Sequence, residues 1–118
     1  MKAFLTGSRA YGAPRPDSDV DMVLLADENV ITLLRAVCDA GWLDQENQYD
    51  ANHSPGKSTG GSFKFGKLNI IAFSDEDRFM AWKIATGNLI RRDVPVDRMD
   101  ARTEIRRVLS LVAGLEYE

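Results

Sequence analysis

GSRAYGAPRPDSDVDMVLL, from Gly7 to Leu25, is the most informative stretch of the chain. Residues 3–6 before it are apolar and β-prone and end at a Gly-Ser pair, which predicts a strand that runs into a turn. Residues 8–12 suit one helical turn, and the prolines within 13–18 favour a loop. The run at 20–26 is apolar apart from one aspartate, which predicts a second, central strand.

Two acidic residues stand at the start of this second strand. Asp19 and Asp21 occupy alternate positions, so a strand would project both side chains from the same face. Two neighbouring carboxylates beside an apolar strand repel each other unless something neutralises them, and a divalent cation with hard oxygen ligands does so. The alternative is that Asp19 caps a turn in the loop while Asp21 pairs with an arginine.

The Gly-Ser pair favours a phosphate site. Gly7 leaves the first strand without a side chain, so a phosphate can approach the backbone closely. Ser8 adds a hydroxyl donor and Arg9 adds a positive charge, although Arg9 is equally consistent with a surface residue. A lone Gly-Ser is a weak signal, whereas strand, Gly-Ser, proline-rich loop and Ser-Asp-Val-Asp in succession form a strong one.

The rest of the chain is predicted to form a helix, a loop, two strands and two further helices. Apolar spacing predicts a helix at about 28–40, and the polar residues 44–61 predict an exposed loop. Two strands, 62–64 and 68–73, follow around a tight turn. Ser74 suits the cap of a helix that ends near Gly87, and a last helix is indicated by apolar residues at helical spacing before a final glycine. These last positions are Ile105, Val108, Leu109, Val112 and Gly114.

The segment from Gly7 to Leu25 resembles the polymerase β-type nucleotidyltransferases, whose motif is a Gly-Ser followed about ten residues later by Asp-x-Asp. It is similar above all to minimal members, and the run Lys67–Ile71 followed by a helix with Trp82 looks like small phage-associated ones. The resemblance implies an α/β (α+β) fold with a small mixed sheet flanked by helices. It also implies a nucleoside triphosphate donor and a two-metal Mg²⁺ site.

The resemblance assigns roles to particular residues of this chain. It places Asp19 and Asp21 as catalytic metal ligands, and Gly7, Ser8, Arg9 and Ser18 at the nucleotide. Members of the family take a third carboxylate from a later strand, where this chain has Asn69. An amide oxygen can ligate Mg²⁺ but brings no charge and accepts no proton. Asn69 is therefore a structural residue, a neutral metal ligand or the mark of a lost activity.

Whole-chain properties limit the possibilities. The 118 residues suit one domain, 1–118, with little room for a separate acceptor site, which suggests a protein partner or a homo-oligomer. A net charge of −3 argues against strong nucleic-acid binding. No apolar run is long enough for a membrane span, and the polar N-terminus does not resemble a signal peptide. We therefore expect a cytoplasmic protein.

Several other signals are weak. Residues 51–58 fit a relaxed phosphate-loop pattern, but the polar segment before them does not suit such a loop; Lys57 alone retains a possible contact with triphosphate. The single histidine, His53, is given no role. Core packing is expected for Trp42, Phe79 and Trp82, and a solvated helix face for the C-terminal arginines Arg91, Arg92, Arg98, Arg102, Arg106 and Arg107. Two hypotheses remain: a metal-dependent nucleotidyltransferase with an unidentified hydroxyl acceptor, or a catalytically impaired nucleotide-binding or interaction module.

Overall fold

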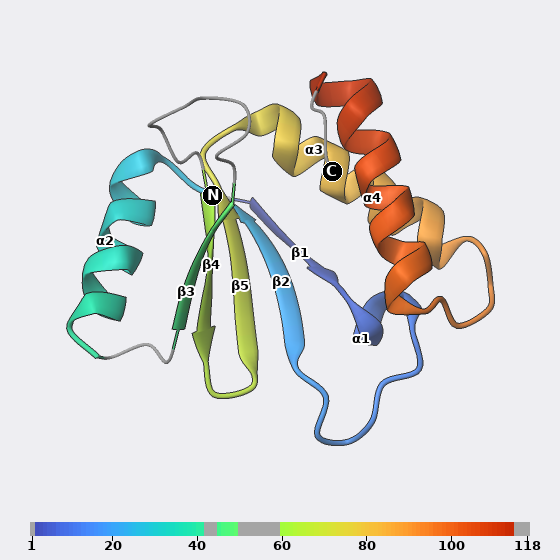
Figure 1. Cartoon of the computed structure of the whole chain (residues 1–118), viewed down its shortest axis with the longest axis horizontal. Helices are drawn as coiled ribbons and strands as arrows, with labels where there is room; N and C mark the ends of the chain where they lie inside the picture. The colour runs from blue at the N-terminus through green and yellow to red at the C-terminus, as the bar shows by residue number, and fades with distance from the viewer. Residues whose placement is uncertain (1, 42–44, 50–59, 115–118) are drawn as a thin grey trace.

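A computed structural model describes residues 2–41, 45–49 and 60–114 of the chain. These residues form five strands and four helices (Figure 1). In chain order they are β1 (Lys2–Thr6), α1 (Ser8–Tyr11), β2 (Val20–Leu25), α2 (Glu28–Asp39), β3 (Gln45–Tyr49), β4 (Gly60–Phe65), β5 (Leu68–Phe73), α3 (Glu76–Ile90) and α4 (Arg98–Ala113).

The strands form a single sheet in the order β1-β2-β5-β4-β3. β2 and β5 pair in parallel at its centre, and the other neighbours are antiparallel. In the parallel register Asp21 lies opposite Asn69, and in the next pair Lys64 lies opposite Asn69. The sheet is therefore mixed, and together with its helices it confirms the predicted α/β fold.

Helices cover both faces of the sheet because the two central strands are apolar on both sides. On one face Ile31 of α2 packs against Phe63 and Ala72. On the other face Phe79 of α3 packs against Val23 of β2 and against Ile71 and Phe73 of β5. Ile71 and Phe73 alternate along β5 with Ala72, which belongs to the α2 side. Alternation also puts Asp21 and Asn69 on the α3 face, because they stand two positions before Val23 and Ile71.

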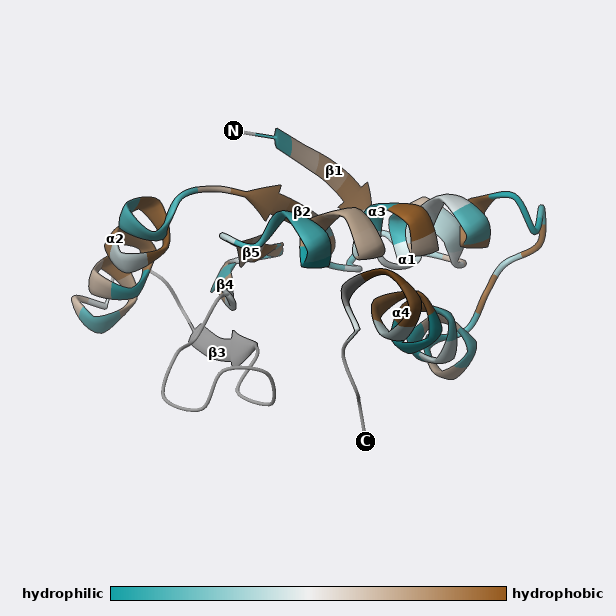
Figure 2. Cartoon of the chain, turned by 90° about the horizontal axis from the view of Figure 1, so that it is seen from above, coloured by the Kyte–Doolittle hydropathy of each residue, from teal (hydrophilic) through white to brown (hydrophobic). Residues whose placement is uncertain are grey.

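The last helix, α4, packs on α3. Ala81 and Ala85 of α3 form one core cluster with Ile105, Val108 and Leu109 of α4. Figure 2 shows the apolar side of α4 turned toward α3. The connection between the two helices is fastened to the N-terminal part of the chain, where the Val96 N–H donates to the Tyr11 carbonyl oxygen at 2.9 Å. Gly114 ends α4 in the left-handed conformation (φ 63°), as predicted.

The predictions for residues 44–61 and for α3 were partly wrong. The segment 44–61 was expected to be a loop, yet β3 occupies Gln45–Tyr49 and β4 begins at Gly60. Gly60 lies so close to β5 that a Cβ there would approach the Ala72 carbonyl oxygen to 2.5 Å, so this glycine belongs to the sheet. The cap of α3 is Asp75 instead of Ser74, and burial of Leu89 carries the helix beyond Gly87 to Ile90.

Some predictions fall on residues outside the described ranges. These are the positions of Trp42, His53 and Lys57 and the whole phosphate-loop-like segment 51–58. Phe79 is buried and Trp82 is partly buried against two core clusters, which confirms core packing for both. Within the described part of the chain, every helix is too short or too polar to cross a lipid bilayer.

Candidate active site

A cleft of about 420 Å³ opens between one end of the sheet and the helical pair α3–α4. The strand side of its lining comes from β1, the α1 turn, the start of β2 and β5, and consists of Thr6, Gly7, Ser8, Tyr11, Asp19, Asp21, Asn69 and Ile71. The helical side consists of Trp82, Val96, Arg98, Ala101, Arg102 and Ile105. The cleft thus unites the Gly-Ser turn and the acidic pair of the sequence motif with residues from the last part of the chain.

Asp19, one residue before β2, and Asp21 on β2 both line the cleft, so the spacing brings the two carboxylates together although only Asp21 belongs to the strand. Asp21 is half-buried on β2, and burial is the largest influence that raises the pKa of its carboxyl. A hydrogen bond from Asn69 opposes this shift, whereas the nearby charge of Asp19 adds to it. Lys64 and Arg98 contribute smaller opposing effects. The site therefore holds a partly desolvated negative charge next to a second carboxylate.

Gly7 makes room for Asp21. Its backbone has φ 74° and ψ −165°, a conformation that is nearly restricted to glycine. A Cβ on residue 7 would lie 2.1 Å from Asp21 Oδ2 and 2.9 Å from its Cγ. Position 7 must therefore lack a side chain to leave room for the Asp21 carboxylate, independently of any phosphate.

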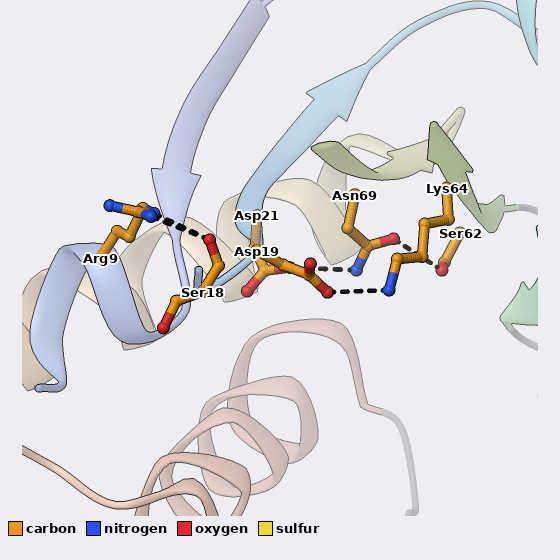
Figure 3. Close-up of polar contacts among 7 residues, drawn as sticks. All are labelled: Arg9, Ser18, Asp19, Asp21, Ser62, Lys64 and Asn69. Carbon is orange, nitrogen blue, oxygen red and sulfur yellow. Dashed lines mark hydrogen bonds and ion pairs between the residues drawn. The ribbon is translucent and has the colours of Figure 1, made fainter. Parts of the chain in front are cut away.

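Asn69 contacts Asp21 through its amide nitrogen. Its Nδ2 donates to Asp21 Oδ1 at 3.1 Å, and its Oδ1 accepts from Ser62 Oγ at 3.1 Å (Figure 3). Because an ionised carboxylate only accepts hydrogen bonds, Asp21 fixes this orientation of the amide. Asn69 lies beside Asp21 as the sequence suggested, but its oxygen points to β4, and its service as a metal ligand stays a prediction.

Arg9 and Ser18 contact each other. The Arg9 guanidinium donates to the Ser18 carbonyl oxygen at 2.9 Å through one terminal nitrogen and at 3.3 Å through Nε. Ser18 Oγ accepts from the Arg15 N–H at 2.7 Å. Neither Arg9 nor Ser18 belongs to the cleft lining described above, so their direct contact with nucleotide stays a prediction. Their contacts hold the loop that leads to Asp19.

Two kinds of site residue were not foreseen from the sequence. Lys64 on β4 reaches Asp19, with 3.0 Å between its Nζ and Oδ2. Arg98 and Arg102, one turn apart on α4, are exposed as expected for a solvated helix face, but they also line the cleft opposite the carboxylates. The spacing of β4 and β5 around their tight turn was a usable signal for Lys64, since residues opposite in a hairpin share a face.

Buried polar contacts support the floor of the cleft. Thr6 Oγ1 and Thr86 Oγ1 lie 2.9 Å apart in a buried hydrogen bond that joins β1 to α3. Burial is the main influence that raises the pKa of Tyr11, and the charge of Asp21 adds to it. The indole Nε1 of Trp82 is buried and has no hydrogen-bond partner among the described residues. The floor is therefore largely desolvated, which strengthens electrostatic interactions there.

The donors present fit one divalent cation. Asp19 and Asp21 supply hard carboxylate oxygens from neighbouring positions, the ligand type that Mg²⁺ prefers. Within the described ranges there is no group of three or more histidine, cysteine, aspartate or glutamate side chains arranged to hold a metal. A second cation would need an additional anionic ligand, which the two aspartates do not provide.

Comparison with known proteins agrees with this geometry. A search of curated proteins finds no match to the chain. The nucleotidyltransferase domain, whose members typically use divalent metals, matches residues 1–79. The match includes β1, the Gly-Ser turn, the acidic pair and Asn69, and it ends inside α3, before the residues that form the helical side of the cleft. The chain therefore belongs to the nucleotidyltransferase domain family of the polymerase β-like superfamily.

Proposed function

We propose that this chain transfers a nucleoside monophosphate from a nucleoside triphosphate to a hydroxyl acceptor. One observation carries the proposal: a single cleft joins the acidic pair Asp19 and Asp21 with the Gly-Ser turn on one side and two arginines on the other. Carboxylates for a cation and cationic side chains for phosphate are the complementary parts of a site for a metal-bound polyphosphate. The family of the chain gives the nucleoside triphosphate as donor.

Each side of the cleft has a role in binding. Gly7 and Ser8 lie beside the carboxylates, where the Ser8 hydroxyl is available to donate to a phosphate oxygen. Arg98 and Arg102 face them from α4 and would neutralise the remaining phosphate charge. Asp19 and Asp21 would hold a divalent cation, which when bound neutralises charge on the phosphate oxygens. The acidic pair alone would repel a triphosphate, so both partners are needed.

The reaction makes one bond and breaks one. The acceptor hydroxyl oxygen forms a bond to the α-phosphorus, and the bond from that phosphorus to the bridging oxygen of pyrophosphate breaks. The hydroxyl proton passes to a carboxylate of the acidic pair or to solvent. Asn69 cannot take it, because an amide has no basic site at neutral pH.

A second function is favoured by the orientation of Asn69. Its N–H group occupies Asp21 Oδ1, so that oxygen is already engaged in a hydrogen bond. A protein with this arrangement that binds nucleoside triphosphate without transferring it would be a nucleotide-binding or interaction module. The two functions share the cleft and differ in whether product is formed.

Calorimetric titration with each of the four nucleoside triphosphates, with and without Mg²⁺, tests the proposal. We expect Mg²⁺-dependent binding that weakens about tenfold or more in Arg98→Gln/Arg102→Gln, since hydrogen bonds to charged groups are each worth roughly 1.5–3 kcal/mol. Arg106→Gln is the matched control, because Arg106 is an exposed arginine of α4 outside the cleft lining. Equal affinity in the cleft variant and the control would place the phosphates elsewhere.

A transfer assay separates the enzyme from the module. Label on the α-phosphate should move to a hydroxyl compound, with release of pyrophosphate, and Asp19→Asn/Asp21→Asn should abolish this transfer. Binding without transfer in the presence of cell extract as the acceptor source would favour the module. We also propose that a protein partner or a second copy of the chain supplies the acceptor site, and that the protein acts in the cytoplasm.

A further inference from the structure

A chain of polar contacts crosses the three strands next to the cleft. Ser62 on β4 donates to Asn69 on β5, and Asn69 donates to Asp21 on β2, each at 3.1 Å. The registers place Asn69 directly opposite both Asp21 and Lys64, so these side chains share the α3 face of the sheet. Asp21 thus receives an N–H donor from the β5 side.

Asp19 is paired with a positively charged side chain from β4, on the same side as Asn69. The ammonium of Lys64 lies 3.0 Å from Asp19 Oδ2, with side-chain exposures of 39% for the lysine and 41% for the aspartate. Figure 3 shows Lys64 and Asn69 approaching the acidic pair from one direction, while Arg9 and Ser18 lie on the other. Both carboxylates therefore face hydrogen-bond donors toward β5 and β4.

This arrangement disfavours a cation on the β5 side. An ammonium repels a divalent cation, and the amide of Asn69 presents its partly positive N–H group to Asp21. One of the two carboxylate charges is already compensated by Lys64. The Asp pair remains accessible from the cleft, on the side of Ser8 and Arg98.

We infer that the site binds a single divalent cation together with the nucleoside triphosphate, and that Lys64 is a resident cation in place of a second metal. Lys64 is thereby a positioning residue: it fixes Asp19 and supplies positive charge on the β4 side of the acidic pair. The inference rests on the proposed function for the identity of the nucleotide. The number of cations rests on the contacts of Lys64 with Asp19 and of Asn69 with Asp21.

Counting bound Mn²⁺ by electron paramagnetic resonance tests the inference. The protein is saturated with a non-hydrolysable nucleoside triphosphate analogue and titrated with Mn²⁺. We expect one Mn²⁺ per wild-type chain. Asn69→Asp alone should also bind one, because the new carboxylate faces Lys64 across the strand pair and gains the ammonium as its partner. Lys64→Met/Asn69→Asp should bind two, since three carboxylates then share the site without the competing charge.

Two further double variants isolate the position of the charge. Lys64→Arg/Asn69→Asp should return the count to one, because arginine restores a cation at position 64. Lys67→Met/Asn69→Asp is the matched control, since Lys67 is an exposed lysine of the adjacent β4–β5 turn outside the cleft lining, and it should also bind one. Thermal unfolding of each variant checks that the protein is folded.

Two results would overturn the inference. One is a count of two for the wild-type protein, which needs no variant to fold. The other is a count of one for a folded Lys64→Met/Asn69→Asp protein. Failure of the proposed function is distinct: the analogue would not bind the wild-type protein at all. In that case the same titration with Mn²⁺ alone still decides whether removing Lys64 opens an additional cation site.

Discussion

Replacing Gly7 with alanine should test the geometry of the site most directly. The backbone at position 7 lies in a region nearly restricted to glycine (φ 74°, ψ −165°), and an alanine there costs roughly 1–3 kcal/mol. The added Cβ would stand 2.1 Å from Asp21 Oδ2, so the carboxylate must move. Moving it costs about 0.5–1.5 kcal/mol for an off-rotamer side chain and loses the bond from Asn69, worth roughly 1.5–3 kcal/mol.

Gly7→Ala should therefore lower the free energy of unfolding by about 3–7.5 kcal/mol, the combined range of these contributions. Urea denaturation followed by far-ultraviolet circular dichroism measures this change in the wild-type and Asp21→Ala backgrounds. Because Asp21→Ala removes the clashing oxygen, Gly7→Ala should cost at least about 2 kcal/mol less there.

Gly66→Ala is the control for backbone strain alone. Gly66 also has positive φ, 58°, but a Cβ on it would meet nothing within 4 Å. Its cost should be about 1–2 kcal/mol and should be the same in both backgrounds. If Gly7→Ala lowers the free energy of unfolding equally in the wild-type and Asp21→Ala backgrounds, to within about 0.5 kcal/mol, then the Asp21 carboxylate does not lie close to position 7.

Three other perturbations have defined outcomes. Asp19→Asn/Asp21→Asn should abolish Mg²⁺-dependent nucleotide binding in calorimetry yet leave the metal-free melting temperature equal or higher. Burial raises the pKa of Asp21, so its charge disfavours the folded state at neutral pH. A large loss of stability would mean that the pair is structural. Asn69→Asp should tighten Mg²⁺ several-fold, because the new carboxylate adds a negative charge next to Asp21 and draws the Lys64 ammonium away from Asp19. Unchanged affinity would mean that residue 69 has no influence on the metal. The hydrogen bond from Arg107 is the largest influence that lowers the pKa of Glu104. The ionised Glu104 carboxylate therefore contributes its full stabilisation above the ordinary glutamate pKa of about 4.3 and loses it as the pH falls through the lowered pKa. Urea denaturation across this acidic range should show a weaker pH dependence for Glu104→Gln than for wild type, and identical slopes would refute this role.

Local patterns were sufficient to predict most of the fold. The strands on both sides of the Gly-Ser motif, the helix after β2 and the hairpin of β4 and β5 all follow from apolar spacing and turn residues. β3 was missed because Gln45–Tyr49 is a polar edge strand, whose ladder hydrogen bonds depend on a partner distant in sequence. The end of α3 was misplaced because burial of Leu89 outweighs the low helix propensity of Gly87.

The site was predictable on its strand side only. Asp19, Asp21, Gly7 and Ser8 belong to one short motif, so their proximity follows from a few local turns. Arg98 and Arg102 come from a helix whose position depends on how α4 packs against α3, and nothing in their local sequence distinguishes them from other exposed arginines. The direction in which Asn69 points its amide was also inaccessible, since it is set by Ser62 and Asp21 across two strand pairs.

The parallel pairing of β2 with β5 has a consequence for how the protein folds. Asp21 and Asn69 are 48 residues apart in sequence, whereas α3 and α4 are consecutive helices that pack on each other. Loop closure over so long a segment is slow, so we expect the helical pair to form early and the central strands to join late. Interactions that form after the rate-limiting barrier slow unfolding and leave the folding rate unchanged. A ligand bound in the cleft should therefore prolong the lifetime of the native state without accelerating its formation.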